Sequence, residues 1–329
     1  MIHIRCGDDM RPAFEASGLA GAYVKCADPL CDGPTPADTE GAAWQAIRAG
    51  FASQTYGVPL AEAERFQTEQ EAGLAKAESA PEIVLWFEHD IFDQIILIFL
   101  LDRFARRPKP DAKLTLICID DYRGIDEFHG LAQLGPDALR ALFADRADIT
   151  DEQTAIARRA WAAYRDADPR AIENLLGEDT RALPFLAGAL LRHLQDFPGL
   201  RDGLARTERQ ALLAVTDGPQ SAEQVFAANQ AMEEARWCGD TMYWAWLRRL
   251  AGGRMPVLTI AGPENWHLDR ELAARTTIGP TRAGQAMLNG GADWAKLAGI
   301  DRWLGGVHLQ GNQPAWRWDE ARRRLVETR

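Results

Sequence analysis

Short, continuously apolar segments alternate with helical patterns over the first 128 residues. The apolar segments predict strands, at residues 2–6, 22–26, 82–88 and 113–119. The segments between them predict helices, at residues 10–17, 40–51, 59–78 and 90–107. Strands of a parallel sheet are apolar along their whole length because helices cover both faces of the sheet. The pattern therefore predicts an α/β domain with a mainly parallel sheet over residues 1–128.

The rest of the chain predicts two further regions. Residues 129–205 form a helical segment, with capping-box spacing at Thr150 and Gln153. Residues 206–329 predict helices at 207–215, 221–230 and 240–251, and then a two-stranded hairpin from residues 257–260 and 266–268. This order of elements is typical of a winged-helix domain, so we expect a winged-helix-like domain here. A further helix is predicted at 281–298.

A tail rich in Gly and Trp, residues 300–318, follows the last predicted helix. Gly305 and Gly306 permit close backbone approach. The tail is either a lid or a contact between domains, or a structural plug that closes the winged-helix-like domain with Trp316 and Trp318. The main contribution of a tryptophan side chain is usually the large apolar area that it buries. This favours the interpretation of the tail as a structural plug.

Composition places the chain among globular proteins. It has 329 residues, of which 47% are hydrophobic and 26% are charged. A chain of this length buries about 75% of the surface of its unfolded form. These values exclude a disordered, fibrous or disulfide-stapled protein. The five cysteines include no Cys-x-x-Cys pair and predict small buried residues in a reducing compartment.

Targeting patterns are missing from the sequence. The first residues lack the basic start and long apolar stretch of a signal peptide. The longest apolar run, residues 95–101, is much shorter than the roughly 20 residues that cross a bilayer. We therefore expect a soluble cytoplasmic protein without a membrane partner.

Charge is unevenly distributed along the chain. The formal net charge is −11, and residues 1–205 hold 34 acidic and 21 basic residues, whereas residues 206–329 hold 14 and 16. The first region should repel nucleic acid at long range. The second could contact nucleic acid but lacks a strong basic footprint. The apolar residues at 240–251 equally suit a protein partner or a homodimer.

Acidic side chains recur where the predicted strands end. Ligands of an open parallel sheet bind in the crevice at the carboxyl ends of its strands, so a binding site is predicted there. Its ligand-binding residues are predicted to be Gly7, Asp8, Asp9, Asp93, Gln94 and Asp120. Its catalytic residues are predicted to be Glu88, His89 and Asp90. Mg²⁺ is the natural cofactor for such carboxylates, with Asp8, Glu88 and Asp120 as its predicted ligands.

The same side chains also have structural interpretations. Asp90 and Asp93 stand where a helix N-cap and a first-turn acid belong, and an acid after the first strand could cap the next helix. Glu88 ends a buried strand and is not needed as a cap, so it is the strongest single candidate. His89 is either a proton shuttle or phosphate contact, or an exposed loop histidine.

Several familiar catalytic motifs are absent. The sequence contains no Gly-x-Gly-x-x-Gly, no P-loop and no His-Glu-x-x-His, and none of its four serines lies in Gly-x-Ser-x-Gly. The ordinary dinucleotide-binding enzymes, P-loop nucleotide hydrolases and nucleophile-elbow hydrolases are therefore excluded.

Four segments of the chain together resemble a bacterial family catalogued as domain of unknown function 1835. They are IRCGDD at 4–9, LWFEHDIFDQ at 85–94, GLARTE at 203–208 and IDRWLGGVHL at 300–309. The resemblance covers essentially the whole chain, and the second and fourth segments are its specific motifs. It implies a shared architecture, and it implies no reaction, substrate, cofactor or functional residue.

Two functional hypotheses follow. In the first, the α/β domain binds a phosphorylated small molecule or nucleotide, and the C-terminal domain passes that state to nucleic acid or a protein partner. In the second, the protein is a metal-dependent phosphoryl-transfer enzyme or hydrolase that uses the strand-end carboxylates. The absence of a recognised catalytic motif and the fused winged-helix-like domain favour the first hypothesis.

Overall fold

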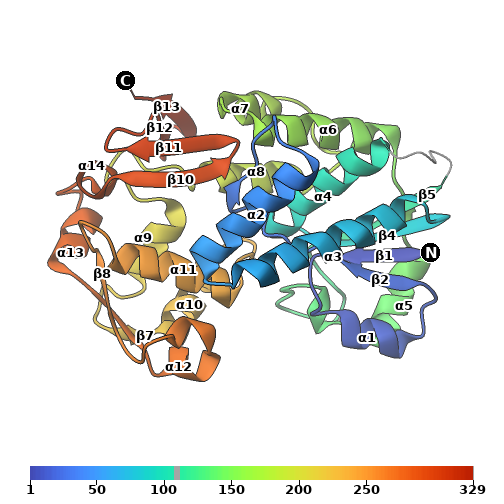
Figure 1. The fold of residues 1–329 in the computed structure, drawn as a ribbon, viewed down its shortest axis with the longest axis horizontal. Helices are drawn as coiled ribbons and strands as arrows, with labels where there is room; N and C mark the ends of the chain where they lie inside the picture. The colour runs from blue at the N-terminus through green and yellow to red at the C-terminus, as the bar shows by residue number, and fades with distance from the viewer. Residues whose placement is uncertain (107–111, 329) are drawn as a thin grey trace.

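Four of the predicted strands form one parallel sheet. The computed structural model describes residues 1–106 and 112–328. Its largest sheet has the strand order β2-β1-β4-β5-β6, in which the first four strands are parallel and β6 is antiparallel to β5 (Figure 1). The strands are β1 Ile2–Arg5, β2 Ala22–Lys25, β4 Glu82–Glu88, β5 Lys113–Ile119 and β6 Ala147–Asp148. The prediction of an α/β fold with a mainly parallel sheet is confirmed.

The central strand of this sheet is buried on both faces. Ile83, Leu85 and Phe87 of β4 join one hydrophobic cluster, whereas Val84 and Trp86 join a second cluster. Successive side chains of a strand point to opposite faces, so the two clusters lie on opposite sides of the sheet. All five side chains are fully buried, which explains why β4 is apolar between its two terminal glutamates.

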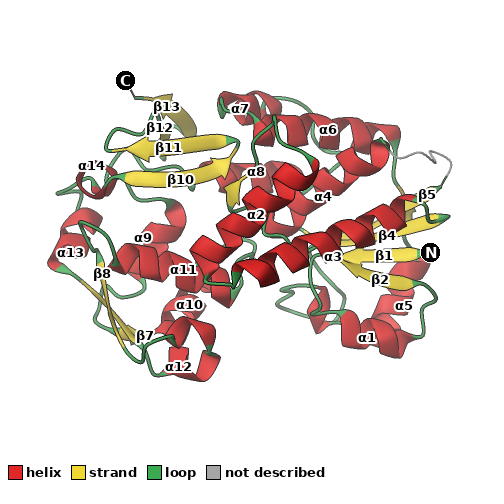
Figure 2. Cartoon of the chain, viewed as in Figure 1, coloured by secondary structure: helices red, strands yellow, loops and turns green. Residues whose placement is uncertain are grey.

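Two groups of helices cover the two faces of the parallel sheet. The smaller cluster draws in α1 Arg11–Ser17 and α5 Pro136–Ala144. The larger cluster draws in α2 Gly41–Tyr56, α3 Leu60–Glu78, α4 Ile91–Ala105, α6 Asp151–Arg165, α7 Arg170–Leu176 and α8 Leu186–Leu194. Figure 2 shows these helices gathered around the sheet, and further strands at the other end of the molecule.

The sequence pattern predicts where helices lie along the chain more accurately than it predicts the residues at which they end. The capping box is confirmed, because Gln153 N donates to Thr150 Oγ1 at 3.1 Å and Thr150 N donates to Gln153 Oε1 at 2.9 Å. Helix α2, predicted to end at residue 51, continues to Tyr56. The predicted last residue of α4, Arg107, lies outside the described residues. Strand β6, within the region predicted to be wholly helical, was not predicted.

The C-terminal region fits a winged-helix arrangement only loosely. Its three helices are α9 Arg206–Leu213, α10 Ala222–Ala231 and α11 Asp240–Ala251, close to the predicted bounds. Its small antiparallel sheet has the order β7-β9-β8, formed by Gln220–Ser221, Thr277–Pro280 and Leu258–Ala261.

The second strand of the predicted hairpin is wrong. Residues 266–268 form a single 3₁₀ turn, η2 Trp266–Leu268, and β8 pairs with β9 instead. The buried Trp266 packs edge-on against Trp244, with ring centroids 5.4 Å apart, and this turn is followed by α12 Arg270–Ala274. An apolar anchor therefore produced the strand-like pattern at 266–268.

The predicted helix at 281–298 is two short helices. Helix α13, Arg282–Leu288, ends before the pair Gly290 and Gly291, and α14, Trp294–Ala298, begins after it. Gly290 has a φ of 72°, the left-handed conformation in which helices commonly end.

The tail forms two antiparallel hairpins that the sequence did not predict. They are β10 Ile300–Gly305 with β11 Val307–Gly311, and β12 Trp316–Asp319 with β13 Arg324–Glu327. Strand β10 also pairs in parallel with β3, Gly33–Pro34, in the loop that follows the second strand. The two ends of the sequence therefore share a small sheet of their own.

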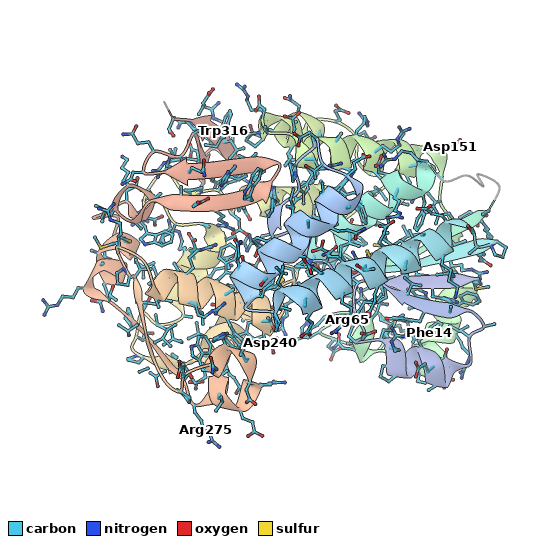
Figure 3. The ribbon with its side chains drawn as sticks, in the orientation of Figure 1. Phe14, Arg65, Asp151, Asp240, Arg275 and Trp316 are labelled. Carbon is cyan, nitrogen blue, oxygen red and sulfur yellow. The ribbon has the colours of Figure 1, made fainter. Side chains whose placement is uncertain are left out.

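The larger hydrophobic cluster extends from the parallel sheet to the tail. Leu85, Trp244 and Trp316 all belong to it, whereas Phe14 belongs to the smaller cluster. Figure 3 shows Phe14 at the lower right of the molecule and Trp316 at its top, left of the centre. None of the helices in the described part of the chain has the length and apolar content that a membrane span requires.

Candidate functional site

The predicted strand-end site lies along one edge of the parallel sheet. In the register, Arg5 of β1 stands beside Trp86 of β4, and Glu88 of β4 stands beside Ile119 of β5. Because parallel strands end at the same edge of a sheet, the segments that follow β1, β4 and β5 leave it side by side. We call this edge the rim.

A buried arginine lies at the centre of the rim. Arg5, the last residue of β1, is 3% exposed. Its guanidinium donates to Asp93 Oδ1 at 2.5 Å, to Asp9 Oδ2 at 3.0 Å and to Glu88 Oε1. A buried charge is tolerated when it is paired and hydrogen-bonded. Sequence reasoning missed Arg5, although a cation that closes an apolar strand among acidic strand ends could have indicated it.

Glu88 is held at the sheet edge by the backbone around it. Its Oε1 accepts a hydrogen bond from Leu131 N at 2.7 Å, and its own N–H donates to Asp93 Oδ1 at 2.8 Å. A Cβ at Gly130 would overlap the Glu88 carboxylate, so a glycine there leaves the room that it needs. Burial raises the pKa of Glu88 to about 7, against the opposing effect of Arg5.

The first turn of α4 is tied to the end of β4. Asp90 is the N-cap of α4, since its Oδ1 accepts from Asp93 N at 3.1 Å, and the capping interpretation of Asp90 is confirmed. Burial raises the pKa of Asp90, and neighbouring Asp93 and Glu88 add to the shift. Gln94 Nε2 donates to Glu88 O at 2.6 Å, and Cys6 Sγ donates to Asp93 Oδ2 at 3.0 Å.

Two of the three predicted metal ligands lie outside this cluster. Asp8 is exposed and pairs with Arg11 and with Lys25, each at 2.7 Å. Asp120 is exposed beyond the end of β5. The predicted set of Asp8, Glu88 and Asp120 therefore does not form a metal-binding group within the described residues, because Asp8 is neutralised at the surface and Glu88 faces Arg5.

Other strand-end residues have structural partners. The carbonyl oxygen of Gly7 accepts from Tyr23 Oη at 2.7 Å. Asp28, which follows β2, pairs with the fully buried Arg48 at 2.7 Å. Both contacts hold loops against the sheet, so neither residue faces a ligand cavity through its polar group.

The rim carboxylates do not fit a magnesium site. Within the described chain, one oxygen each of Glu88, Asp90 and Asp93 lie within 4.8 Å of one another. Arg5 already supplies the counter-charge to Glu88 and Asp93, and all three acids are at most 4% exposed. Mg²⁺ keeps several of its waters and takes few protein ligands, so it needs a more open and unpaired set of carboxylates.

A cleft of about 370 Å³ opens beside the rim, and we call it the rim cleft. His89 and Ile91 line it from the rim, Phe185 lines it from the segment before α8, and Arg206 and Arg323 line it from the C-terminal region. The ring of His89 packs edge-on against Phe185 at a centroid distance of 6.0 Å. Its Nδ1 is buried and has no hydrogen-bond partner in the described chain, and burial lowers the pKa of this imidazole.

The arginines of the rim cleft differ in how they are paired. Buried Arg192 donates to both oxygens of Glu233, at 2.8 and 2.7 Å. Arg206 donates to Glu234 Oε2 at 2.6 Å. Arg323, in the turn between β12 and β13, forms no ion pair or hydrogen bond with any described residue. Its φ of 50° is a left-handed conformation that costs a residue with a Cβ about 1–2 kcal/mol.

A larger cavity, of about 870 Å³, adjoins the rim cleft. The two share Gln195, Arg206, Glu234 and Arg323 as lining residues. Arg201 and Arg209 line the larger cavity, and Arg209 pairs with buried Asp202. Arg323 therefore stands where the two spaces meet.

Comparisons with known proteins give no family for this chain. No protein-family model matches it, and a search of curated proteins finds no significant match. The resemblance to domain of unknown function 1835 therefore stays a prediction from the sequence.

Proposed function

We propose that the protein binds a phosphate-bearing small molecule in the rim cleft and that its C-terminal region responds to the bound ligand. The observation that supports this proposal most directly is the unpaired guanidinium of Arg323. The other arginines of the cleft are neutralised by Glu233 and Glu234. The planar fork of an arginine matches the oxygens of a phosphate and donates two parallel hydrogen bonds to them.

His89 provides a second polar contact in the same cleft. Because burial lowers the pKa of its imidazole, the ring is mostly neutral at pH 7. A neutral imidazole offers one donor and one acceptor. His89 is therefore suited to a hydroxyl or a protonated phosphate oxygen, while Arg323 takes the charged oxygens. We assign His89 to ligand binding rather than to proton transfer.

Ligand binding can be coupled to the C-terminal region because the lining residues of the rim cleft belong to two separate parts of the chain. His89 belongs to the rim, and Arg323 belongs to the last hairpin of the tail. A ligand held by both side chains would fix the distance between these two parts of the chain. A ligand can shift a conformational equilibrium only by its different affinity for the two states, and contacts from both walls provide such a difference.

The C-terminal region is better suited to contact a protein partner, or a second copy of this chain, than nucleic acid when it responds to the bound ligand. In a winged helix, the third helix enters the major groove. Seven side chains of α11 are buried here. Its two arginines are also engaged, since Arg248 donates to Thr55 O at 2.7 Å and Arg249 pairs with Glu208 at 2.9 Å. Helix α11 therefore has neither a free face nor free cations for DNA.

Calorimetric titration with pyrophosphate tests the proposal. We expect wild-type protein to bind pyrophosphate, and Arg323→Asn to bind it about tenfold to hundredfold more weakly, since hydrogen bonds to charged groups contribute about 1.5–3 kcal/mol. Asparagine adopts the left-handed conformation readily, so the turn is kept. Arg324→Asn is the matched control, because Arg324 is exposed on β13 and does not line the cleft.

Three outcomes would overturn the proposal: no heat with wild-type protein, equal losses in both variants, or binding by Arg323→Asn at wild-type strength. The metal-dependent enzyme is the alternative function, and it would require Glu88 and Asp93 to exchange their pairing with Arg5 for a metal ion. Pyrophosphate binding that requires Mg²⁺, with both lost in Glu88→Gln, would favour that enzyme over the binding protein.

A further inference from the structure

A third cavity, of about 330 Å³, is lined by residues of helices α2, α3, α4 and α6 and of the segments that adjoin them. We call it the helical cavity. It shares no lining residue with the rim cleft or with the larger cavity beside it. Its volume is in the range of small-molecule sites. Nothing in the sequence pattern indicates it, because its lining residues come from four helices that are distant along the chain.

One wall of the helical cavity is aromatic. Trp44 of α2, Phe99 of α4 and Trp161 of α6 line it. The ring of Trp161 lies 5.3 Å from that of Phe99 and 6.2 Å from that of Trp44, between centroids. The guanidinium of Arg165 lies 5.3 Å from the centre of the Trp44 ring and 5.5 Å from that of Trp161. These contacts hold the aromatic wall in place before any ligand arrives.

The same lining includes an amide whose side chain has no hydrogen-bond partner among the described residues. Gln67 of α3 lines the helical cavity, is 4% exposed, and forms no hydrogen bond with any residue that the structure describes. Its amide atoms are not among the fully buried polar atoms that lack a partner, so they stay accessible from the cavity. The polar groups of Gln67 are therefore available to a molecule in the cavity.

The neighbouring charged groups are already used. Arg103 donates to Glu78 at 2.7 Å and to both oxygens of Glu71, at 2.7 and 2.6 Å. Gln70 uses its Oε1 to accept from Ala27 N at 2.8 Å and from Asp28 N at 3.1 Å, which leaves its NH₂ group as a donor. The unused hydrogen-bonding groups in the lining of the helical cavity thus include the amides of Gln67 and Gln70 and the buried Nε of Arg165.

We propose that the helical cavity binds a nucleobase as part of a nucleoside. A base would stack on Trp44, and the Gln67 amide would donate to and accept from the donor–acceptor edge of the base. A glutamine amide makes this bidentate contact with the N6 and N7 atoms of adenine. Stacking of a base on an aromatic side chain adds affinity that does not depend on which base is present. A sugar fits less well, because its many hydroxyls need several free polar partners and the acids here are paired, Glu71 and Glu78 with Arg103 and Glu40 with Arg106.

Calorimetric titration with adenosine tests this proposal separately from the proposed function. Adenosine has no phosphate and pyrophosphate has no base, so the two ligands report on different cavities. We expect adenosine to bind wild-type protein and Arg323→Asn equally. We expect Gln67→Leu to weaken adenosine binding tenfold or more, and its melting temperature to equal or exceed that of wild type, since the lost amide has no partner within the protein.

Gln54→Leu is the matched control, because Gln54 is exposed on the same helix as Trp44 and lines none of the three cavities. It should bind adenosine as wild type does. The inference fails if adenosine gives no heat with wild-type protein, if glucose binds in its place, or if Gln67→Leu binds adenosine at full strength. It also fails if Gln67→Leu melts several degrees lower, because that result would show a structural role for the amide.

Discussion

Arg5 determines what the other charged residues of the rim can do. One guanidinium faces Glu88, Asp93 and Asp9 at hydrogen-bonding distance. Removing one partner of a buried ion pair leaves the other charge uncompensated, which costs about 3–5 kcal/mol. The carboxylates are therefore bound to the fold through Arg5, and catalysis that depends on their release from it would have to pay this cost.

The pKa of Glu88 predicts an unusual dependence of stability on pH. Because this pKa is raised to about 7 in the folded state, folded Glu88 keeps a proton between pH 4.5 and 7 that the unfolded chain has lost. The stabilising contribution is present below pH 4.5 and is lost as the pH rises through 7. We expect the free energy of unfolding of wild type, relative to Glu88→Gln, to fall by about 2 kcal/mol from pH 5 to 8.

Urea denaturation of both proteins at several pH values measures this difference. Taking the difference matters because His193 acts in the opposite direction. Burial lowers its pKa to about 3, so its contribution is present above pH 6.5 and is lost on acidification. Glu82→Gln, at the other end of β4, is the control variant and should leave the slope unchanged. A wild-type to Glu88→Gln difference that is constant with pH would contradict the prediction.

Single residues also show how far sequence reasoning reaches. Glu88 could be singled out, because an acid that closes a buried strand is rare enough to stand out. Its partner Arg5 was missed because a charge at a strand end is usually solvated, although the acids at the neighbouring strand ends could have indicated it. Gln67 gave no signal at all, because glutamine is common on helices and its burial depends on three other helices.

At the scale of elements, the turn between β10 and β11 sits against the end of α6. Gly306 N donates to Tyr164 O at 2.9 Å. A Cβ at Gly306 would overlap the carbonyl group of Arg165, and backbone atoms there have little freedom to move. We expect Gly306→Ala to lower the free energy of unfolding by about 1–3 kcal/mol or more.

The matched control for Gly306→Ala is Gly50→Ala, inside α2, where a Cβ would meet no atom within 4 Å. That variant should be more stable than wild type by about 0.5–1 kcal/mol, because alanine suits a helix interior better than glycine does. Thermal or urea unfolding measures both changes. Equal changes in the free energy of unfolding for the two substitutions would show that the turn between β10 and β11 is not closely packed against α6.

Elements were predictable where one physical cause produced the pattern. Strand 82–88 matches the structure because both of its faces are buried, so every position between its terminal glutamates is apolar. The strand assigned to 266–268 failed because Trp266 is an anchor in a single turn, and three residues cannot distinguish that from a strand. The tail strands were missed because their glycines and tryptophans serve close packing and give no alternating pattern.

At the scale of the whole molecule, the three regions predicted from the sequence, residues 1–128, 129–205 and 206–329, contribute to one hydrophobic cluster. Leu85, Phe197 and Trp318 belong to it, from the sheet, the helical middle and the tail. Backbone contacts also cross these regions, since Gly199 bridges Trp318 and β3 pairs with β10. The bounds at 128 and 205 remain predictions, and the shared cluster argues that the pieces depend on one another.

Removal of the tail tests this dependence. A chain that ends at residue 298 lacks β10 to β13 and leaves Gly33 and Pro34 without their strand partner. We expect this chain to lose cooperative unfolding and the near-ultraviolet circular dichroism of fixed aromatic side chains, while helices remain. A chain that ends at residue 328 is the control. Cooperative, two-state melting of the shortened chain would show that residues 1–298 fold independently.

The pairing of β3 with β10 also constrains the order in which the protein can be completed during synthesis. The loop that carries Gly33 and Pro34 is synthesised before its partner at Leu304 and Gly305. In a nascent chain, β3 therefore lacks its strand partner until β10 has been made. Before β10 is made, the exposed edge of β3 is a binding site for chaperones that recognise unpaired strands. A chain truncated before β10 would keep this edge exposed.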